Sequence, residues 1–342
     1  MQTGRLPLIV LTGALGAGKT TLLNGALRDP AMARTALIVN EFGDVGIDHL
    51  LMQASSDHTI ELSGGCLCCA VRGAFTDGLT DLLMARRGDF DRIIVETSGL
   101  ADPGPILTAL HAHPFLSTAI RSSGVVCAVD SSARIDAAGA SEFAAPEFAS
   151  QVVLADRIVL TKTDVTAPSK RLTDCLAAMA PAADMMDVSA LGFTPAHAFS
   201  PMFVARKFRV SSVPTHGERA APIAVSLVSD RPMAVAHLDQ FLNQLMGRYG
   251  ANLLRVKGLV WTKTDGNRPL LVQAVGQVLA PFERLDCWAH DGAETRLVVI
   301  CRAANVDDVT RLFASFNDGV AADLPDADAL ANNPLAVPGV RF

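Results

Sequence analysis

The chain has 342 residues, half of them hydrophobic, which is enough for two globular domains on the usual relation between length and domain number. Its formal net charge of −6 indicates no basic surface of the kind that binds nucleic acid or an acidic membrane. We therefore exclude nucleic acid and membranes as partners. A small molecule or another protein is expected instead, and a homo-oligomer is left open.

The apolar runs and the cysteines indicate where the protein works. No stretch reaches the roughly 18 unbroken apolar residues that a membrane helix needs. The seven cysteines are an odd number and include the adjacent Cys68 and Cys69, whose disulfide would strain the backbone. A reducing compartment fits them better than a disulfide scaffold does, so we expect a cytoplasmic protein.

Short apolar runs alternate with longer amphipathic stretches from Leu6 to about Ser189. Parallel strands covered on both faces are apolar almost throughout, and the runs with this character are residues 6–12, 35–40, 90–96, 124–130 and 156–162. Helical stretches separate them, for example at 20–28, 75–87 and 105–113. The pattern predicts an α/β domain over residues 1–191, with a mainly parallel sheet and helices on both of its faces.

The composition changes between residues 192 and 221, where prolines are frequent and the hydrophobic periodicity is weak, so we expect a linker there. A second unit, residues 222–316, has strand-like and helix-like runs that predict a small α+β domain. Its expected strands are 223–229, 253–262, 270–280 and 295–302, and its expected helices are 237–249 and 306–316. Residues 317–342 are rich in Ala, Asp and Pro and are expected to form a flexible tail.

The stretch GALGAGKT at 13–20 matches the phosphate-loop pattern G-x-x-x-x-G-K-[ST], after an apolar strand and before a helix. Backbone N–H groups of such a loop wrap phosphates, the Lys19 amine balances their charge, and the Thr20 hydroxyl can coordinate Mg²⁺. The alternative is a turn that merely connects strand to helix. The candidate phosphate contacts are Gly13, Gly16, Ala17, Gly18, Lys19, Thr20 and Thr21.

The stretch TKTD at 161–164 follows an apolar strand, which places Asp164 at the carboxyl end of the sheet, where this fold binds ligands. A carboxylate there can accept both N1–H and the exocyclic amine of guanine, whereas adenine offers no such pair of donors. We therefore expect GTP, with Lys162 and Asp164 at the base, and Ser189-Ala190 as a weaker candidate contact. An ordinary turn at the end of a strand is the alternative.

Two acidic segments lie between the phosphate loop and the base loop. In ETSGLADP, Glu96 ends an expected strand and Gly99 follows at the spacing of a γ-phosphate contact, so Glu96 can order the attacking water or a water bound to Mg²⁺. In VNEFGDVGID, Glu41, Asp44 and Asp48 crowd a loop that contains glycine. We take Lys19, Glu96 and Asp48 as candidate catalytic residues; solvated surface is the alternative for such a loop.

The stretch ELSGGCLCCAVR places Cys66, Cys68 and Cys69 between these two acidic segments. Three thiolates on a Gly-Gly loop can converge on one ion, they suit Zn²⁺ and other borderline-soft metals, and they leave a coordination position for an exchanging ligand. A redox-active thiol cluster and buried structural cysteines are the alternatives. The sequence thus predicts a metal site inserted in a nucleotide-binding domain.

The sequence resembles the CobW-like family of metal-linked GTPases, relatives of the nickel-handling HypB and UreG proteins. The motifs that carry the resemblance are GALGAGKTTLLN, VNEFGDVGID, GGCLCCAVR, ETSGLADP and ADRIVLTKTD, and the segment from Ile223 to Phe316 resembles the family's C-terminal domain. The resemblance implies a GTPase that binds Zn²⁺ or Co²⁺ through Cys66, Cys68 and Cys69, with Glu41 as a further ligand, and that delivers the metal to a client protein.

The chain departs from the pattern of this family in three respects. Thr161 stands where many relatives have Asn, Asp44 replaces Glu, and no His-rich run is present among the eight histidines. His111 and His113 form the one close pair, and we interpret them as surface residues at the end of a helix, with metal binding as the alternative.

Four functions agree with these motifs. The favoured one is a slow GTPase with Mg²⁺ as cofactor, whose nucleotide state controls its affinity for Zn²⁺ and which hands the metal to a client metalloprotein. The others are a cobalt chaperone for cobalamin synthesis, a metal sensor or buffer in which GTP is structural, and a nucleoside triphosphatase with a redox-sensing thiol cluster.

Overall fold

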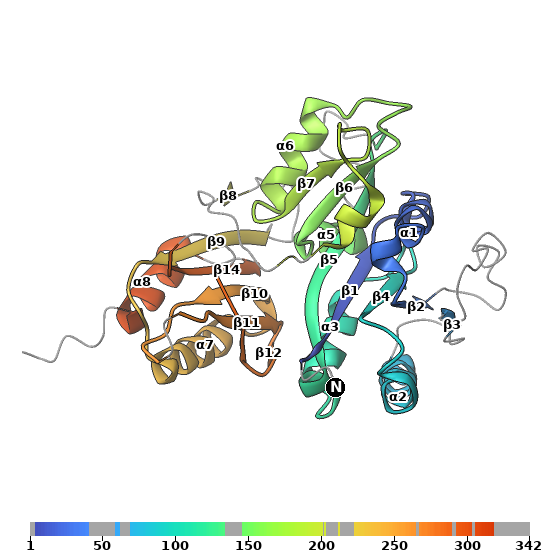
Figure 1. Cartoon of the computed structure of the whole chain (residues 1–342). Helices are drawn as coiled ribbons and strands as arrows, with labels where there is room; N and C mark the ends of the chain where they lie inside the picture. The colour runs from blue at the N-terminus through green and yellow to red at the C-terminus, as the bar shows by residue number, and fades with distance from the viewer. Residues whose placement is uncertain are drawn as a thin grey trace, which may run out of the picture.

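The protein, seen here as a computed structural model, has two sheets that lie next to each other (Figure 1). The structure describes residues 4–40, 59–61, 69–133, 146–200, 202, 211–212, 222–264, 267–288, 292–302 and 305–317. Among these residues no helix is long and apolar enough to cross a membrane.

The N-terminal sheet is parallel throughout and has the strand order β3-β2-β4-β1-β5-β6-β7. The strands are β1 (Leu6–Thr12), β2 (Thr35–Asn40), β3 (Thr59–Glu61), β4 (Arg92–Thr97), β5 (Ile120–Asp130), β6 (Arg157–Thr161) and β7 (Asp184–Asp187). The α/β fold class expected from the apolar runs is confirmed. β1 and β2 have the expected bounds, whereas β5 starts earlier than expected because its first, partly polar residues pair with Leu6 to Leu8 of β1.

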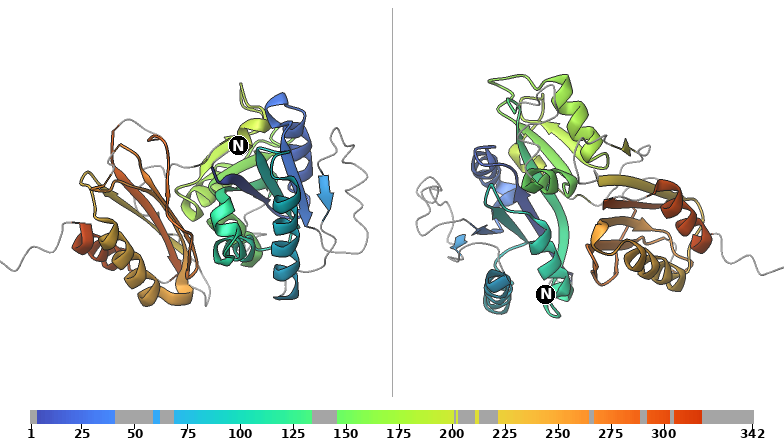
Figure 2. Two further views of the ribbon diagram at one scale, coloured as in Figure 1. Left: turned by 60° about the horizontal axis from the view of Figure 1, so that its bottom comes forward. Right: turned by 180° about the vertical axis from the view of Figure 1, so that it is seen from behind.

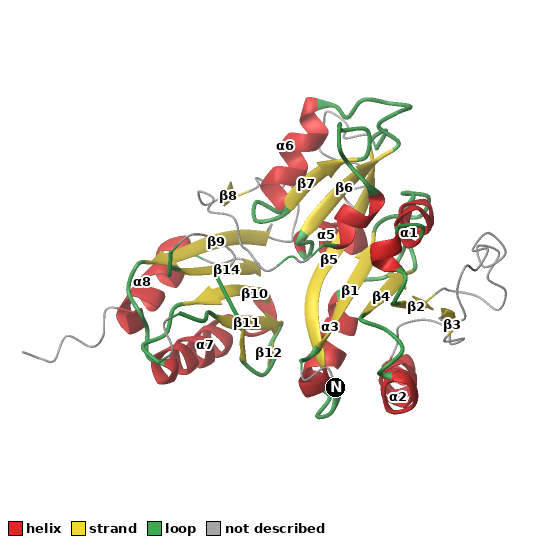
Figure 3. Ribbon diagram, in the orientation of Figure 1, coloured by secondary structure: helices red, strands yellow, loops and turns green. Residues whose placement is uncertain are grey.

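Helices cover both faces of this sheet (Figure 3). On one face the core contains residues of α2 (Cys69–Arg86), α3 (Gly104–Ala112), α5 (Pro146–Val153) and α6 (Lys170–Met179). The other face is covered by α1 (Lys19–Leu27), with the short helices η1 (Pro30–Met32) and η4 (Pro195–Phe199). A further short helix, α4 (Leu116–Ala119), leads into β5.

The stretch after residue 192 differs from the linker expected there. Ala198 and Phe199 of η4 are buried in the core against β1 and α1, and the Arg157 guanidinium donates to the carbonyl oxygens of His197 and Ala198. Proline and weak periodicity conceal this packing in the sequence because a single short helical turn carries too few residues to show a period. The parallel sheet therefore extends its core to at least Phe199.

The second sheet is antiparallel, with the strand order β12-β11-β10-β14-β9-β8 and with β13 paired to β11. The strands are β8 (Ser211–Ser212), β9 (Pro222–Ser229), β10 (Leu253–Val260), β11 (Leu270–Val275), β12 (Val278–Leu279), β13 (Glu283–Arg284) and β14 (Thr295–Arg302). The expected single strand 270–280 is divided into two by a turn at Gly276, whose φ of 57° favours glycine.

Two helices, α7 (Val235–Tyr249) and α8 (Val306–Asn317), pack on one face of the antiparallel sheet and form one core with it, and η5 (Gly250–Asn252) follows α7 (Figure 2). Side chains alternate along β10 after the register shift between Leu253 and Arg255: Val256 and Val260 lie in this core, whereas Arg255 and Lys257 point to the other face. The face opposite α7 and α8 is therefore the one that meets the N-terminal domain.

Charged and polar side chains join the two domains. The Asp156 carboxylate, just before β6, accepts hydrogen bonds from Arg255 and from Lys257, each at 2.7 Å. The Gln273 amide donates to the Ser122 carbonyl oxygen at 2.7 Å. Since these side chains are buried or nearly so, each contact fixes the position of one domain relative to the other.

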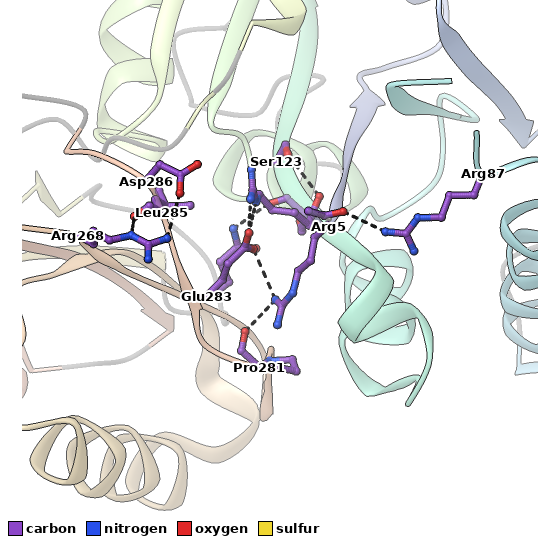
Figure 4. Close-up of polar contacts among 12 residues, drawn as sticks. Arg5, Arg87, Ser123, Arg268, Pro281, Glu283, Leu285 and Asp286 are labelled. Atoms are coloured by element: carbon purple, nitrogen blue, oxygen red, sulfur yellow. Dashed lines mark hydrogen bonds and ion pairs between the residues drawn. The ribbon is translucent and has the colours of Figure 1, made fainter. Parts of the chain in front are cut away.

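A second polar cluster lies nearer the start of β1 (Figure 4). Arg5 donates to the Pro281 carbonyl oxygen at 3.0 Å, and its guanidinium lies 3.6 Å from the Glu283 carboxylate. Arg121 of β5 also donates to Glu283, at 2.8 Å. Two arginines of the N-terminal domain thus share one carboxylate of the C-terminal domain.

Candidate nucleotide site and metal loop

The phosphate loop, residues 13–18, connects the end of β1 to the start of α1 at the carboxyl edge of the parallel sheet. Gly18 has a φ of 83° immediately before α1, a conformation that favours glycine. A Cβ atom at Gly13 would collide with the carbonyl oxygen of Ala128 in β5. The loop therefore needs glycine at both of these predicted positions for its own backbone geometry.

The first two side chains of α1 contact the phosphate loop and the end of β4. The Lys19 amine donates to the carbonyl oxygens of Gly13 and Ala14 at 2.9 and 3.0 Å, and the residue is buried. The Thr20 hydroxyl donates to a carboxylate oxygen of Glu96 at 3.0 Å. Glu96 is the next-to-last residue of β4 and is 5% exposed, so the structure brings three of the predicted site residues into one cluster.

The loop after β4, residues 98–103, crosses the phosphate loop. A Cβ atom at Gly99 would lie 2.5 Å from the Leu15 backbone nitrogen, closer than any real side chain allows. The predicted γ-phosphate contact, Gly99, therefore lies directly against the phosphate loop. Here the close approach of two backbones, and not a positive φ, requires glycine.

The predicted base loop lies beside the phosphate loop at the same edge of the sheet. Thr161, at the end of β6, is buried and donates to the Ala17 carbonyl oxygen at 2.7 Å. Thr161 thus ties the base loop to the phosphate loop. Lys162 has a φ of 56° and its amine pairs with Asp130 at 2.6 Å, whereas Asp164 is exposed.

Asp187 at the end of β7 joins the base loop to the Ser189-Ala190 segment. Its carboxylate accepts hydrogen bonds from the Thr163 hydroxyl at 2.5 Å and from the Ser189 backbone N–H at 2.8 Å. Partial burial acts to raise the pKa of Asp187, but these hydrogen bonds outweigh it and hold the pKa below its usual value. The two segments predicted to contact the base are therefore held together by a carboxylate.

The remaining predicted phosphate contacts occupy the same loop and helix start. Ala17 is buried, whereas Gly16 and Thr21 are exposed. Gly16 has a φ of 74°. All predicted phosphate and base contacts lie in the described part of the chain and at the carboxyl edge of the parallel sheet.

The predicted metal ligands are placed less completely. Of these ligands, Glu41, Cys66 and Cys68 lie outside the described residues, and Cys69 is the first residue of α2. The predicted catalytic residue Asp48 and its neighbour Asp44 also lie outside the described residues. The ranges that the structure does describe contain no group of three or more residues able to hold a metal ion.

The cysteines elsewhere in the chain have different environments. Burial raises the pKa of the Cys127 thiol and of the Cys301 thiol to about 12, and it also raises the pKa of the half-buried Cys175. Metals bind the thiolate, so these protonated thiols are poor ligands. Cys287 is a free cysteine and is exposed.

The structure corrects the interpretation of His111 as a surface residue. It is 8% exposed, neither ring nitrogen has a hydrogen-bond partner among the described residues, and it lines a pocket between the domains with Arg5, Gln273 and Glu283. The sequence of α3 alone cannot show that His111 is buried, because residues of the C-terminal domain cover its side chain. His113 is half-buried, and its Nδ1 accepts the Leu116 backbone N–H.

Two polar residues of the site were not identified from the sequence. Asp130 ends β5, much as Glu96 lies near the end of β4, so its position at the end of an apolar strand was a usable signal. Gln151 on α5 is fully buried and donates to the carbonyl oxygens of Gly99 and Ala101. No sequence signal marks a lone glutamine in a short helix.

A parallel sheet whose first strand leads through a glycine loop into a helix, with a Lys, a Thr and a strand-end carboxylate gathered there, defines a P-loop nucleotide-binding protein. The chain belongs to the family described as CobW/HypB/UreG, nucleotide-binding domain, which it matches over residues 7–187. Residues 223–317 match the family described as cobalamin synthesis protein cobW C-terminal domain. The resemblance found in the motifs is thereby confirmed.

Relatives in this family cover nearly the whole chain. The zinc chaperone YjiA of Escherichia coli is 32% identical over 320 residues, which span 89% of this chain and 96% of YjiA. The zinc chaperone CobW of Pseudomonas aeruginosa is 34% identical, over 86% of this chain and 87% of that protein. The crystal structure of Zn(II)-bound YjiA GTPase from E. coli superposes with a TM-score of 0.58 at 26% identity, covering 92% of this chain and 99% of YjiA. These matches thus span both domains of this chain and most of the length of each relative.

Proposed function

We propose that the protein is a GTP-hydrolysing metallochaperone that binds Zn²⁺ through Cys66, Cys68 and Cys69 and delivers it to a client metalloprotein in the cytoplasm. The observation that carries the nucleotide part is the cluster of Lys19, Thr20 and Glu96 beside Gly99. A phosphate loop, a hydroxyl, a buried carboxylate and a γ-phosphate contact are the parts that phosphoryl transfer to water requires.

Guanine is the proposed base because Asp164 stands at the carboxyl edge of the sheet and can accept two hydrogen bonds from it. The hydrogen bond from Thr161 to Ala17 links the base loop to the phosphate loop, so the proposed contacts to the base and to the phosphates come from two loops that are held together. Lys162 contributes its aliphatic stem and charge beside the base. Adenine would leave one Asp164 oxygen without a donor.

The Thr20 hydroxyl and the Glu96 carboxylate fit Mg²⁺, since both are hard oxygen donors and they lie 3.0 Å apart. When bound, Mg²⁺ neutralises charge on the phosphates. In our proposal Thr20 is a direct ligand, Glu96 orients a water molecule, and Lys19 stabilises negative charge that develops on the β- and γ-phosphates. Asp48 remains a further proposed catalytic residue.

The metal part of the proposal rests on chemistry and on the family. Thiolates at positions 66, 68 and 69 suit Zn²⁺, and three of them leave a position for an exchanging ligand, which a chaperone needs and a closed structural site lacks. Position 69 begins α2, where the helix dipole favours a negative charge. Relatives named zinc chaperones make Zn²⁺ the preferred cargo, with Co²⁺ as the alternative and Glu41 as a further ligand.

The experiment compares GTP and ATP turnover with Zn²⁺ binding in the same protein. We expect Mg²⁺-dependent GTP hydrolysis, little ATP hydrolysis, and about one Zn²⁺ per chain in a chelator competition. Changing Cys66, Cys68 and Cys69 together to Ser should abolish tight Zn²⁺ binding, while Cys287→Ser, at an exposed cysteine elsewhere, should leave it unchanged. An equal loss of Zn²⁺ binding in the triple variant and in Cys287→Ser would contradict the proposal, and so would equal rates of ATP and GTP hydrolysis.

Co²⁺ distinguishes the metal site from a redox cluster. Thiolate ligation to Co²⁺ produces charge-transfer absorption, which should appear in the parent protein and be absent from the triple variant. A thiol cluster that oxidises reversibly and shows no such band would favour the redox alternative.

A further inference from the structure

The side chain of Gln151 links α5 to the loop that is proposed to contact the γ-phosphate. Its Nε2 donates to the Gly99 carbonyl oxygen at 3.1 Å and to the Ala101 carbonyl oxygen at 3.0 Å. The residue is 0% exposed. One amide therefore uses both of its donors to hold two carbonyl groups of the same loop.

This linkage leaves polar groups that another arrangement of the loop could satisfy. The Oε1 atom of Gln151 and the Oγ atom of Ser98 are buried and have no hydrogen-bond partner among the described residues. Buried polar groups without partners are unfavourable, so they favour a conformation that pairs them. These two unpaired groups therefore favour a second conformation of the loop at residues 98–101, in which they would find partners.

The C-terminal end of α5, close to Gln151, is attached to the C-terminal domain. Val153, the last residue of α5, is 1% exposed and packs in one apolar cluster with Ala224 of β9 and with Val298 and Ile300 of β14. The next residue, Leu154, accepts a hydrogen bond from Arg255 through its carbonyl oxygen. Leu154 is only three positions after Gln151 in the chain, so α5 cannot shift without disturbing the domain interface.

Asp156 strengthens the same attachment. Its carboxylate binds Arg255 and Lys257, and it also accepts the Val125 backbone N–H at 2.8 Å. The two cations come from β10, and Val125 belongs to β5 in the centre of the parallel sheet. The segment that follows α5 is therefore fixed on one side to the nucleotide-binding sheet and on the other to the C-terminal domain.

A second helix connects the same two places. α3 begins at Gly104, directly after the loop at 98–103, and it contacts β11 and β12 of the C-terminal domain. The loop is thus followed in sequence by one helix that reaches the domain interface and is bonded through Gln151 to another.

We propose that Gln151 is a positioning residue that holds the loop at 98–101 against the phosphate loop and couples the presence of the γ-phosphate to the C-terminal domain through α5. The inference rests on the proposed GTPase function and adds the route by which the second domain responds to the nucleotide. A γ-phosphate at Gly99 orders the loop, the loop moves or stiffens α5 through Gln151, and α5 transmits this through Val153, Leu154 and Asp156 to β9, β10 and β14.

The test compares Gln151→Met with Gln273→Met. Methionine keeps the length and volume of the side chain and removes the amide. Gln273 is a matched control because it is also buried and donates to one backbone carbonyl, that of Ser122, but at the domain interface and away from the loop. The affinities for GDP and for a non-hydrolysable GTP analogue are measured for both variants and the parent, together with backbone hydrogen exchange in each nucleotide state.

We expect Gln151→Met to lower the affinity for the GTP analogue by about five- to thirtyfold, which corresponds to the loss of two neutral hydrogen bonds. The affinity for GDP should change by less than about twofold. In the parent and in Gln273→Met, exchange in β10 should be slower with the analogue than with GDP. In Gln151→Met this difference should vanish.

If a folded Gln151→Met protein keeps the parent's ratio of analogue affinity to GDP affinity, this inference is overturned, while the proposed GTPase function still stands. A decrease in that ratio of the same size in Gln273→Met would also overturn the inference. Persistence of the exchange difference in β10 would overturn the coupling route. A parent protein that binds neither nucleotide would overturn the proposed function and this inference with it.

Discussion

The Thr20 hydroxyl and the Glu96 carboxylate are 76 residues apart in sequence and 3.0 Å apart in the structure. Thr20 is the last residue of the phosphate-loop pattern, and Glu96 lies at the carboxyl end of β4, the strand beside β1. Their contact brings a candidate Mg²⁺ ligand and a candidate water-orienting carboxylate to one point at the edge of the sheet.

Glu96→Gln should lower GTP turnover while leaving nucleotide binding nearly intact. The amide keeps the size of the side chain but removes the negative charge that orders a water molecule beside the phosphates, so we expect a decrease of about 10²- to 10³-fold in kcat. Single-turnover hydrolysis and fluorescent-nucleotide titration measure the two quantities. Normal turnover in this variant would exclude Glu96 from the reaction.

Lys19→Ala should cripple both nucleotide binding and hydrolysis. The variant removes the one phosphate-loop side chain that carries a positive charge, and its amine is directed to the interior of the loop by Gly13 and Ala14. We expect at least a tenfold loss of GTP affinity with an unchanged circular dichroism spectrum. Unaltered turnover in the folded variant would show that the loop at 13–20 is not the phosphate site.

Asp164→Asn should lower the affinity for GTP selectively, because an amide cannot accept the two hydrogen bonds that guanine donates. Thr161→Val is the companion variant: it preserves shape and removes the hydroxyl that tethers the base loop to Ala17. We expect about a tenfold loss of GTP affinity for Asp164→Asn and a smaller loss for Thr161→Val, with ATP affinity unchanged in both. Competition between GTP and ATP measures this, and equal competition in the parent would refute the preference for guanine.

The fold and the nucleotide loops could be predicted because they follow from local patterns. Buried parallel strands are apolar runs, and the phosphate loop has its own spacing of glycines, Lys19 and Thr20. The packing of Phe199, the burial of His111 and the role of Gln151 could not be predicted. Each depends on contacts between segments far apart in sequence, which periodicity and motif spacing do not record.

His111 should make the protein less stable in mild acid. Burial, together with the positive charges of Arg255 and Arg5, lowers its pKa from 6.5 to about 4, and Arg121 and Glu283 line the same pocket. Between these pH values the unfolded chain binds a proton that the folded chain does not, so the free energy of unfolding falls as the pH falls. The expected loss is about 2 kcal/mol from pH 6.5 to 5.

His111→Phe should remove this part of the pH dependence, as followed by urea unfolding at several pH values. His237→Phe, on α7 and more exposed, serves as the control and should retain the slope of the parent. The same slope in the parent and in His111→Phe would contradict the assignment.

Asp156→Asn should destabilise the domain interface strongly because it leaves Arg255 and Lys257 without their buried counter-charge. Breaking one partner of such a cluster typically costs about 3–5 kcal/mol. The control is Asp91→Asn, whose partner Arg34 is largely exposed and where the expected cost is about 0–1 kcal/mol. Similar unfolding free energies for the two variants would show that Asp156 does not hold the domains together.

The central claim, that nucleotide state controls metal affinity, is tested most directly by Zn²⁺ affinity in a chelator competition with bound GDP and with a non-hydrolysable GTP analogue. The account predicts a tighter site with the analogue, by about 5- to 150-fold, and an equal gain in analogue affinity when Zn²⁺ is bound, because linkage is reciprocal. The triple variant of Cys66, Cys68 and Cys69 should lose both effects. Equal Zn²⁺ affinity in the two nucleotide states of the parent protein would leave no mechanism that joins hydrolysis to metal release, and the metallochaperone account would be contradicted.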